Sequence, residues 1–170
     1  MTTTADATQA LLRHLVATLA YRAAKVLRDV PASSFSGFSS GHGTRRPLDI
    51  LAHLGDLMGW AVRMAQGEYV WRADGSDDWD AEVHRFFDGV AALDQCLASN
   101  APPDRYAEML IQGPLADTLT HVGQLAMLRG AAGIPVRPES YARAEIVAGR
   151  VGLEQATPVR EFDGDASARP

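Results

Sequence analysis

Apolar residues recur at steps of three and four through most of this chain, and no other feature constrains its fold as strongly. That spacing places side chains on one face of an α-helix, whereas a strand requires strict alternation. The period occurs in four stretches: residues 5–30, 47–67, 76–100 and 114–133. Because no segment alternates convincingly, the pattern predicts an all-α chain, a four-helix bundle whose helices pack close to antiparallel.

Prolines, glycines and acidic residues mark the ends of the predicted helices. Pro47 stands at the first turn of the second helix, where its missing N–H is tolerated. Ser76 and the acidic residues that follow it predict the start of the third helix, since acidic groups favour the positive end of the helix dipole. A short helical turn is expected at residues 104–111, before Gly113 and Pro114 restart the chain.

Length and composition predict one domain. With 170 residues, of which 46% are hydrophobic, the chain can bury one sizeable core but not two. We assign residues 5–140 to the bundle and residues 141–170 to a C-terminal extension, whose last ten residues are polar enough to be disordered. Residues 32–46 are rich in serine and glycine, which predicts a connection. Cys96 has apolar neighbours and is interpreted as a small buried hydrophobe.

The charge balance and the amino-terminal segment argue against two classes of partner. Lys and Arg number 16 against 21 Asp and Glu, and the formal charge of -5 is unsuited to gripping a phosphate backbone, so we expect no nucleic-acid partner. The start MTTTADATQA lacks the basic region and apolar core of a secretory signal, and no stretch is long enough to cross a bilayer. The single cysteine fits a reducing compartment, so we expect a cytoplasmic protein without membrane contact.

A polar line on the fourth predicted helix marks the first candidate site. Asp117, His121 and Gln124 follow one another at steps of four and three, so they share one helix face. Asp117 and His121 lie about 6 Å apart along the axis, which suits two ligands of one ion. The opposite face is apolar, which indicates a largely buried helix whose polar line points into the bundle. A carboxylate buried there requires a histidine, an arginine or a cation as its partner.

His53 interrupts an apolar line on the second predicted helix in the same way. If the second and fourth helices meet, His53, Asp117 and His121 form a set of two imidazoles and one carboxylate. Such a set leaves coordination positions open, as hydrolytic zinc sites and non-haem iron sites do. The alternative is that His53 is a core histidine with its own hydrogen-bond partner, while Asp117 and His121 form an ordinary intrahelical pair.

Two phrases resemble the signature regions of the DinB/YfiT family of bacterial four-helix bundles. They are LDILAHLGDLMGWA in the second predicted helix and PLADTLTHVGQLAMLRGAAGIPV in the fourth, and their order and spacing cover most of residues 5–140. The resemblance implies a divalent metal held by one histidine near the start of the second helix and by a histidine pair in the fourth. His53 matches the first of these ligands and His121 the last, and Gln124 matches the glutamine that follows the pair.

The chain departs from the family pattern at two positions. Asp117 stands where the family usually has a histidine, and Val122 stands where it often has an arginine. An aspartate is a competent hard ligand that shifts the preference away from softer metals. The resemblance therefore implies a divalent metal, and it leaves zinc, nickel, iron and manganese unresolved.

The resemblance also implies thiol chemistry, because characterised relatives include transferases and an isomerase that use a low-molecular-weight thiol such as mycothiol or bacillithiol. We therefore expect a metal-dependent thiol S-transferase that acts on a small electrophile, with Gln124 or Trp60 contacting the substrate. Two alternatives stay open. One is a metal-dependent hydrolase that uses water in place of the thiol. The other is a non-catalytic bundle that stores a metal, binds a ligand or forms a homodimer through an apolar helix face.

The remaining histidines and a pair of arginines are weaker candidates. His42 lies in a glycine-rich loop close in sequence to the second helix, from which it could swing over the site. Arg45 and Arg46 stand near the same end as His53 and could receive an anionic substrate. His14 and His84 fall outside the apolar stripes of their helices and are interpreted as surface residues.

Overall fold

The computed structural model describes residues 4–41, 43–100, 102 and 104–162, and over these residues the chain is all-helical, which confirms the predicted all-α class. The four long helices are α1 (Thr4–Leu27), α3 (Pro47–Ala65), α4 (Trp79–Ser99) and α6 (Ala116–Ala131). The shorter elements are α2 (Ala32–Phe35), α5 (Asp104–Leu110), η1 (Ile111–Leu115) and η2 (Tyr141–Arg143). In this described part, strand-like pairing is confined to one bridge between Glu139 and Glu161. No described helix combines the length and the apolar character that crossing a membrane requires.

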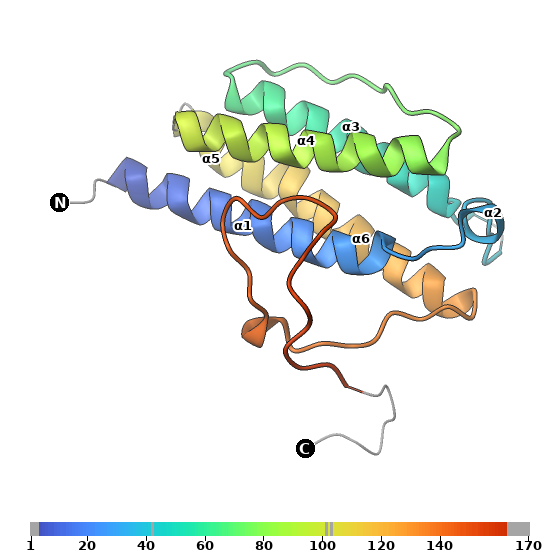
Figure 1. Cartoon of the computed structure of the whole chain (residues 1–170). Coiled ribbons are helices and arrows are strands. Elements are labelled where there is room, and N and C mark those ends of the chain that lie inside the picture. The colour runs from blue at the N-terminus through green and yellow to red at the C-terminus, as the bar shows by residue number, and fades with distance from the viewer. Residues whose placement is uncertain (1–3, 42, 101, 103, 163–170) are drawn as a thin grey trace.

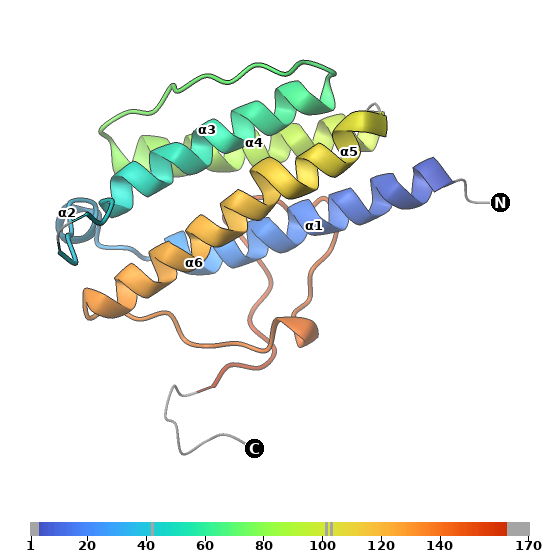
Figure 2. The ribbon, with the colours of Figure 1, turned by 180° about the vertical axis from the view of Figure 1, so that it is seen from behind.

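The four long helices surround one apolar core. α3 packs against α4 and α6, and α1 packs against the same two helices, so the four form a closed ring of neighbours (Figures 1 and 2). Each of these helices turns apolar side chains to this core. The fully buried side chains at the centre include Leu19, Leu54, Phe86, Leu93 and Leu125. Burying such faces against one another, rather than helix propensity, stabilises helices of this length.

The neighbours α3 and α4 run in the same direction, and so do α1 and α6 (Figure 1). Side-chain contacts agree: Arg129 near the end of α6 donates to the carbonyl oxygen of Val26 near the end of α1 at 2.7 Å. The prediction of close-to-antiparallel packing is therefore wrong for these two pairs. The cause is the connection over residues 66–78, because an extended residue spans roughly 3.3 Å and the segment can return along the whole of α3.

Two predicted helix boundaries differ from the structure. α1 ends at Leu27 rather than at residue 30. α4 begins at Trp79 rather than at Ser76, because the carboxylate of Asp78 caps the helix by accepting a hydrogen bond from the Ala81 N–H at 2.8 Å. An aspartate in this position satisfies one of the amide groups that the first turn of a helix leaves unpaired.

Two segments that were predicted as breaks in the helical structure contain helix. Within the connection 32–46, α2 buries Phe35, whose ring centre lies 5.7 Å from that of Trp79. At Gly113 and Pro114 the chain does not restart. Instead η1 carries α5 into α6 as one kinked rod, and Gly113 absorbs the bend with φ of -96° and ψ of -106°. Gly113 and Pro114, which predicted a break, therefore mark a kink in a continuous rod, because a proline inside a helix bends it.

The chain after α6 returns to α1 and is held there by buried polar contacts. The carboxylate of Glu139 accepts hydrogen bonds from the Tyr21 hydroxyl and from the Lys25 ammonium, both at 2.7 Å. Burial and the Glu139 carboxylate raise the pKa of Tyr21. Glu161, which was predicted to lie in a disordered tail, forms a further ion pair with Lys25 at 2.5 Å. Phe162 is also placed, since its N–H donates to the Pro138 carbonyl oxygen at 2.8 Å, and residues 163–170 of that predicted tail lie outside the described residues.

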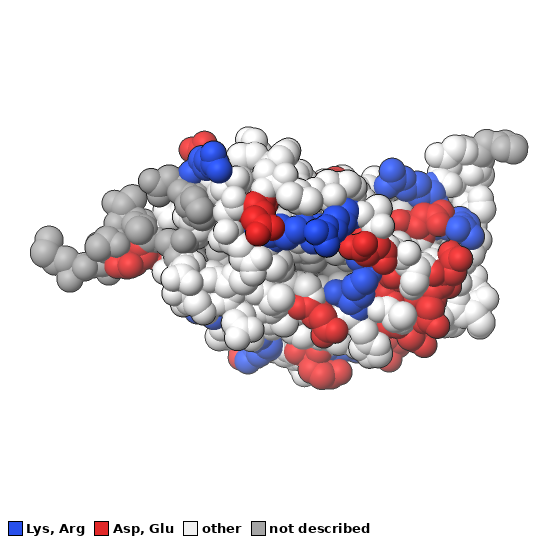
Figure 3. Space-filling view, turned by 90° about the horizontal axis from the view of Figure 1, so that it is seen from above, with Lys and Arg blue, Asp and Glu red and all other residues white. Residues whose placement is uncertain are grey.

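The exposure of three side chains tests how the sequence was interpreted, and two of the three interpretations are confirmed. His14 and His84 are exposed, as predicted. Cys96 is only half-buried, because it borders a surface hollow together with Gln66 and Asn100. In the view from above, acidic side chains gather at the end of the molecule that carries α2 and the start of α4, and basic side chains lie among them rather than in one continuous patch (Figure 3).

Candidate metal centre

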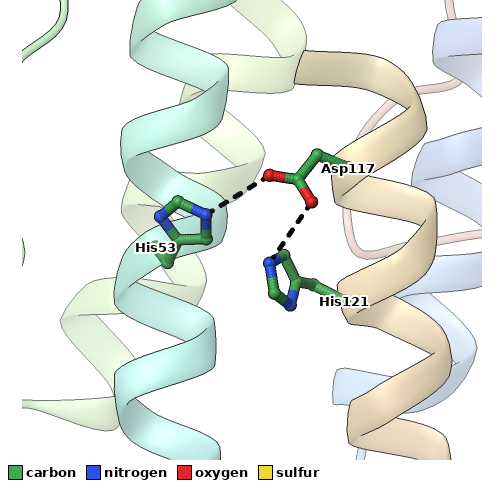
Figure 4. Close-up of side chains that lie close together, drawn as sticks. All are labelled: His53, Asp117 and His121. Atoms are coloured by element: carbon green, nitrogen blue, oxygen red, sulfur yellow. Dashed lines mark ion pairs between the residues drawn. The ribbon is translucent and has the colours of Figure 1, made fainter. Parts of the chain in front are cut away.

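Three potential ligand side chains converge where α3 faces α6 (Figure 4). His53 comes from α3, and Asp117 and His121 come from α6. Each residue offers one ligand atom, and these three atoms lie within 4.8 Å of one another. The two oxygens of the Asp117 carboxylate face different rings, because Oδ2 is 3.4 Å from His53 Nε2 and Oδ1 is 3.4 Å from His121 Nε2. This group could hold one metal ion, and we call it the metal centre.

Local helix geometry and core packing place these side chains. Asp117 and His121 are one helical turn apart, so their side chains project from the same face of α6. The buried residues Thr118, Val122 and Leu125 turn the other face of α6 to the core. The metal centre consequently lies on the seam between α3 and α6.

The exposure of the metal centre differs from what the sequence predicted. The side chains of His121, His53 and Asp117 are 12%, 24% and 45% exposed. The prediction that the polar line points into the buried interior is therefore wrong for Asp117, whose carboxylate is reached by water. A half-exposed carboxylate does not require a cation as its partner, because water solvates it. The same opening gives small molecules access to the metal centre.

The electrostatics favour the metal-binding form of His53. Burial lowers the pKa of His53, and the neighbouring His121 lowers it further, while Asp117 partly opposes the shift. The ring is therefore neutral at pH 7, with a lone pair available. A neutral imidazole is the form that ligates a metal ion.

Gln124 contacts the ring nitrogen of His121 that does not face Asp117. The carboxamide oxygen of Gln124 lies 2.7 Å from His121 Nδ1. In the tautomer that protonates Nδ1, this N–H donates to the Gln124 oxygen and leaves Nε2, on the Asp117 side of the ring, free to ligate a metal ion. The sequence predicted Gln124 as a substrate contact, and the structure adds a contact that holds the direction of the His121 ring. Such outer contacts commonly fix the tautomer and direction of metal-ligating histidines.

This contact leads to a prediction for metal affinity. Replacing Gln124 by leucine removes the acceptor, and we expect divalent-metal affinity to fall by roughly 10- to 100-fold. Gln124→Glu keeps an oxygen in place and is expected to retain affinity within about threefold of the parent. Competition against a chromogenic chelator measures both variants. Equal losses in the two would show that the contact does not orient His121.

A pocket of about 360 Å³ opens beside His121 and Gln124 on one side of the metal centre. Arg45, predicted as a substrate contact, lies on its lining, together with Ser40, Gly43, Thr44, Ile50, Met127 and Leu128. Arg46 does not take part, because its side chain pairs with Asp49 at 2.6 Å, and the Asp49 carboxylate also accepts from the Arg46 N–H at the start of α3. His42 lies outside the described residues.

Trp60 lies on the other side of the metal centre from this pocket, beside a residue that the sequence analysis missed. Trp71, in the connection 66–78, places its ring centre 5.7 Å from that of His53 and 5.6 Å from that of Trp60. The only sequence signal was the run of large apolar residues Tyr69, Val70 and Trp71 within a mostly polar connection. Asp56 takes no part in the metal centre, because it is buried and pairs with Arg85 at 2.9 Å.

Comparisons with protein-family models, with curated proteins and with solved structures give no match for this chain. The DinB/YfiT resemblance therefore stays a prediction from the two sequence phrases. Any statement about function has to come from the metal centre and its surroundings.

Proposed function

We propose that this chain is a four-helix bundle of DinB/YfiT type that binds one divalent ion at His53, Asp117 and His121. We further propose that it transfers a low-molecular-weight thiol of the mycothiol or bacillithiol type to a small electrophile. The observation that supports the proposal most strongly is the convergence of three ligand atoms, from two helices, within 4.8 Å beside a pocket.

The donor set fits a divalent ion. Two imidazole nitrogens and one carboxylate oxygen suit zinc, nickel, iron and manganese, and three protein ligands leave coordination positions for a substrate. The half-exposed Asp117 leaves a route to those positions. When bound, such an ion supplies a positive charge that lowers the pKa of a thiol in contact with it, so that the thiol reacts as a thiolate.

The residues of the pocket have separate tasks in this proposal. Arg45 places a permanent positive charge beside the metal centre, which suits an anionic group of the thiol or of the electrophile. Ile50 and Leu128 line the same pocket with apolar side chains that exclude water. Gln124 keeps His121 in one orientation. Together these groups hold two reactants near one point, which lowers the entropic part of the barrier.

The test uses 1-chloro-2,4-dinitrobenzene as the electrophile and a panel of thiols that includes mycothiol, bacillithiol and cysteine. In the reaction a sulfur–carbon bond forms, the carbon–chlorine bond breaks, chloride leaves and the thiol proton goes to solvent. We expect turnover with at least one thiol, dependent on added divalent metal and abolished in His121→Ala. Absorbance of the thioether product measures it. His84→Ala, which changes an exposed histidine, is the control and should retain full activity.

The experiment also distinguishes transfer from storage. A protein that binds metal stoichiometrically but turns over no thiol in the panel would contradict the transferase proposal. Metal-independent turnover that is equal in the parent and His121→Ala would contradict the role of the metal centre.

A further inference from the structure

Three aromatic side chains form a wall beside the metal centre. Trp60 belongs to α3, and Tyr69 and Trp71 belong to the connection 66–78. The ring centre of Trp60 lies 5.5 Å from that of Tyr69 and 5.6 Å from that of Trp71, and both ring pairs meet edge to face. Trp71 also meets the ring of His53 at 5.7 Å. We call Trp60, Tyr69 and Trp71 the aromatic wall.

The metal centre lies between the aromatic wall and the pocket. α3 and α6 run in opposite directions (Figure 2), so their side chains meet in opposite order along the seam. Ile50 and Leu128 line the pocket, His53 and His121 meet in the middle, and Trp60 lies next to Gly113, where an added Cβ would be 3.6 Å from its ring. A molecule held at the metal centre therefore has the pocket to one side and Trp71 to the other.

The ring of Trp71 is both open and held in place. The residue is 46% exposed, so part of its surface is available to a ligand. The connection that carries it is fixed on both sides of the ring. Arg63 Nε donates to the carbonyl oxygen of Val70 at 2.8 Å, and the N–H of Asp74 donates to Asp56 at 2.9 Å. An exposed aromatic surface on a fixed backbone binds a flat apolar group at little entropic cost.

We propose that Trp71 contacts the substrate, and that the electrophile carries a flat aromatic or conjugated group which packs on its ring. This inference rests on the proposed function, since it requires an ion at the metal centre. Offset or edge-to-face contact between aromatic rings strengthens binding by roughly three- to tenfold, relative to a ligand that carries an alkyl group in place of the ring.

The test uses two metal-directed probes, benzohydroxamate and acetohydroxamate, on the zinc-loaded full chain. Both bind an ion through the same two oxygens, and they differ only in a phenyl or a methyl group. We expect the parent to prefer benzohydroxamate by about tenfold, with quenching of tryptophan fluorescence. Trp71→Ala should reduce the preference to about twofold, and Trp71→Phe should retain most of it. Val70→Ala changes the adjacent exposed residue and should behave as the parent.

The ratio of the two affinities separates the outcomes. An unchanged ratio in Trp71→Ala would overturn the inference, whether both affinities stay the same or both fall by the same factor. The second of these results would show that Trp71 only covers His53. Binding of acetohydroxamate reports the ion independently of Trp71. Failure of both probes and of zinc on the parent would therefore overturn the proposed function itself, and this inference with it.

Discussion

His121→Ala is expected to lower divalent-metal affinity by more than about 100-fold, so that the protein purifies without stoichiometric metal. The imidazole is the least exposed of the three potential ligands, and its Nε2 faces Asp117 at 3.4 Å. Its loss leaves only two protein ligands, from two different helices, and leaves Gln124 without the ring that it orients. Elemental analysis of untagged protein, followed by competition titration with a chromogenic chelator, measures the change.

The control for this variant is His14→Ala, which removes an exposed imidazole from α1. It should bind metal as the parent does. Circular dichroism should show the same helix content in all three proteins, because His121 lies at the seam rather than in the apolar core. Full metal occupancy of His121→Ala would exclude the metal centre as the binding site.

Arg85→Leu is expected to destabilise the fold by about 3 kcal/mol. Arg85 pairs with Glu82 at 2.6 Å and with Asp56 at 2.9 Å, and it donates to the carbonyl oxygen of Ala52. The side chains of Glu82 and Asp56 are only 1% and 9% exposed, so the variant leaves two carboxylates buried without their cation. We expect the lower end of the range for broken buried pairs because the Arg85 side chain is 27% exposed. Urea unfolding measures the difference.

A second substitution tests the cause of this loss. Glu82→Gln in the Arg85→Leu background removes one unpaired buried charge and should recover roughly 1 kcal/mol. A double variant that is no more stable than Arg85→Leu would show that packing, rather than charge, explains the loss. The same groups hold the connection 66–78, since the N–H groups of Asp74 and Ser76 donate to Asp56 and Glu82. Arg85→Leu should therefore also raise the mobility of Trp71, which the difference in tryptophan fluorescence anisotropy between this variant with and without Trp71→Phe reports, since the chain also holds Trp60 and Trp79.

Part of the metal centre could be predicted from local sequence patterns. The step of four between Asp117 and His121 already placed both on one face, because that relation depends only on the geometry of a single turn. His53 was recognised as a polar residue on an apolar face, and the structure brings it to the other two. The role of Gln124 in orienting His121 was missed, although its step of three from His121 carried the signal.

The exposure of Asp117 and the contact of Trp71 with His53 were beyond sequence reasoning. Apolar periodicity says which face of a helix turns to the core, and it does not say how far the seam between two helices is open to water. Trp71 comes to His53 only because the connection 66–78 runs back along α3. That path is held by Asp56 of α3 together with Glu82 and Arg85 of α4, so it depends on the packing of two helices.

The four long helices and the two phrases that resemble the DinB/YfiT family could be recognised from local patterns, because they depend on residues within a few turns of one another. Three features could be recognised only in the folded chain: α3 and α4 run in the same direction, the chain after α6 returns to α1, and the metal centre lies between a pocket and the aromatic wall. These features depend on contacts between residues far apart in the chain, whose free energies no local pattern encodes.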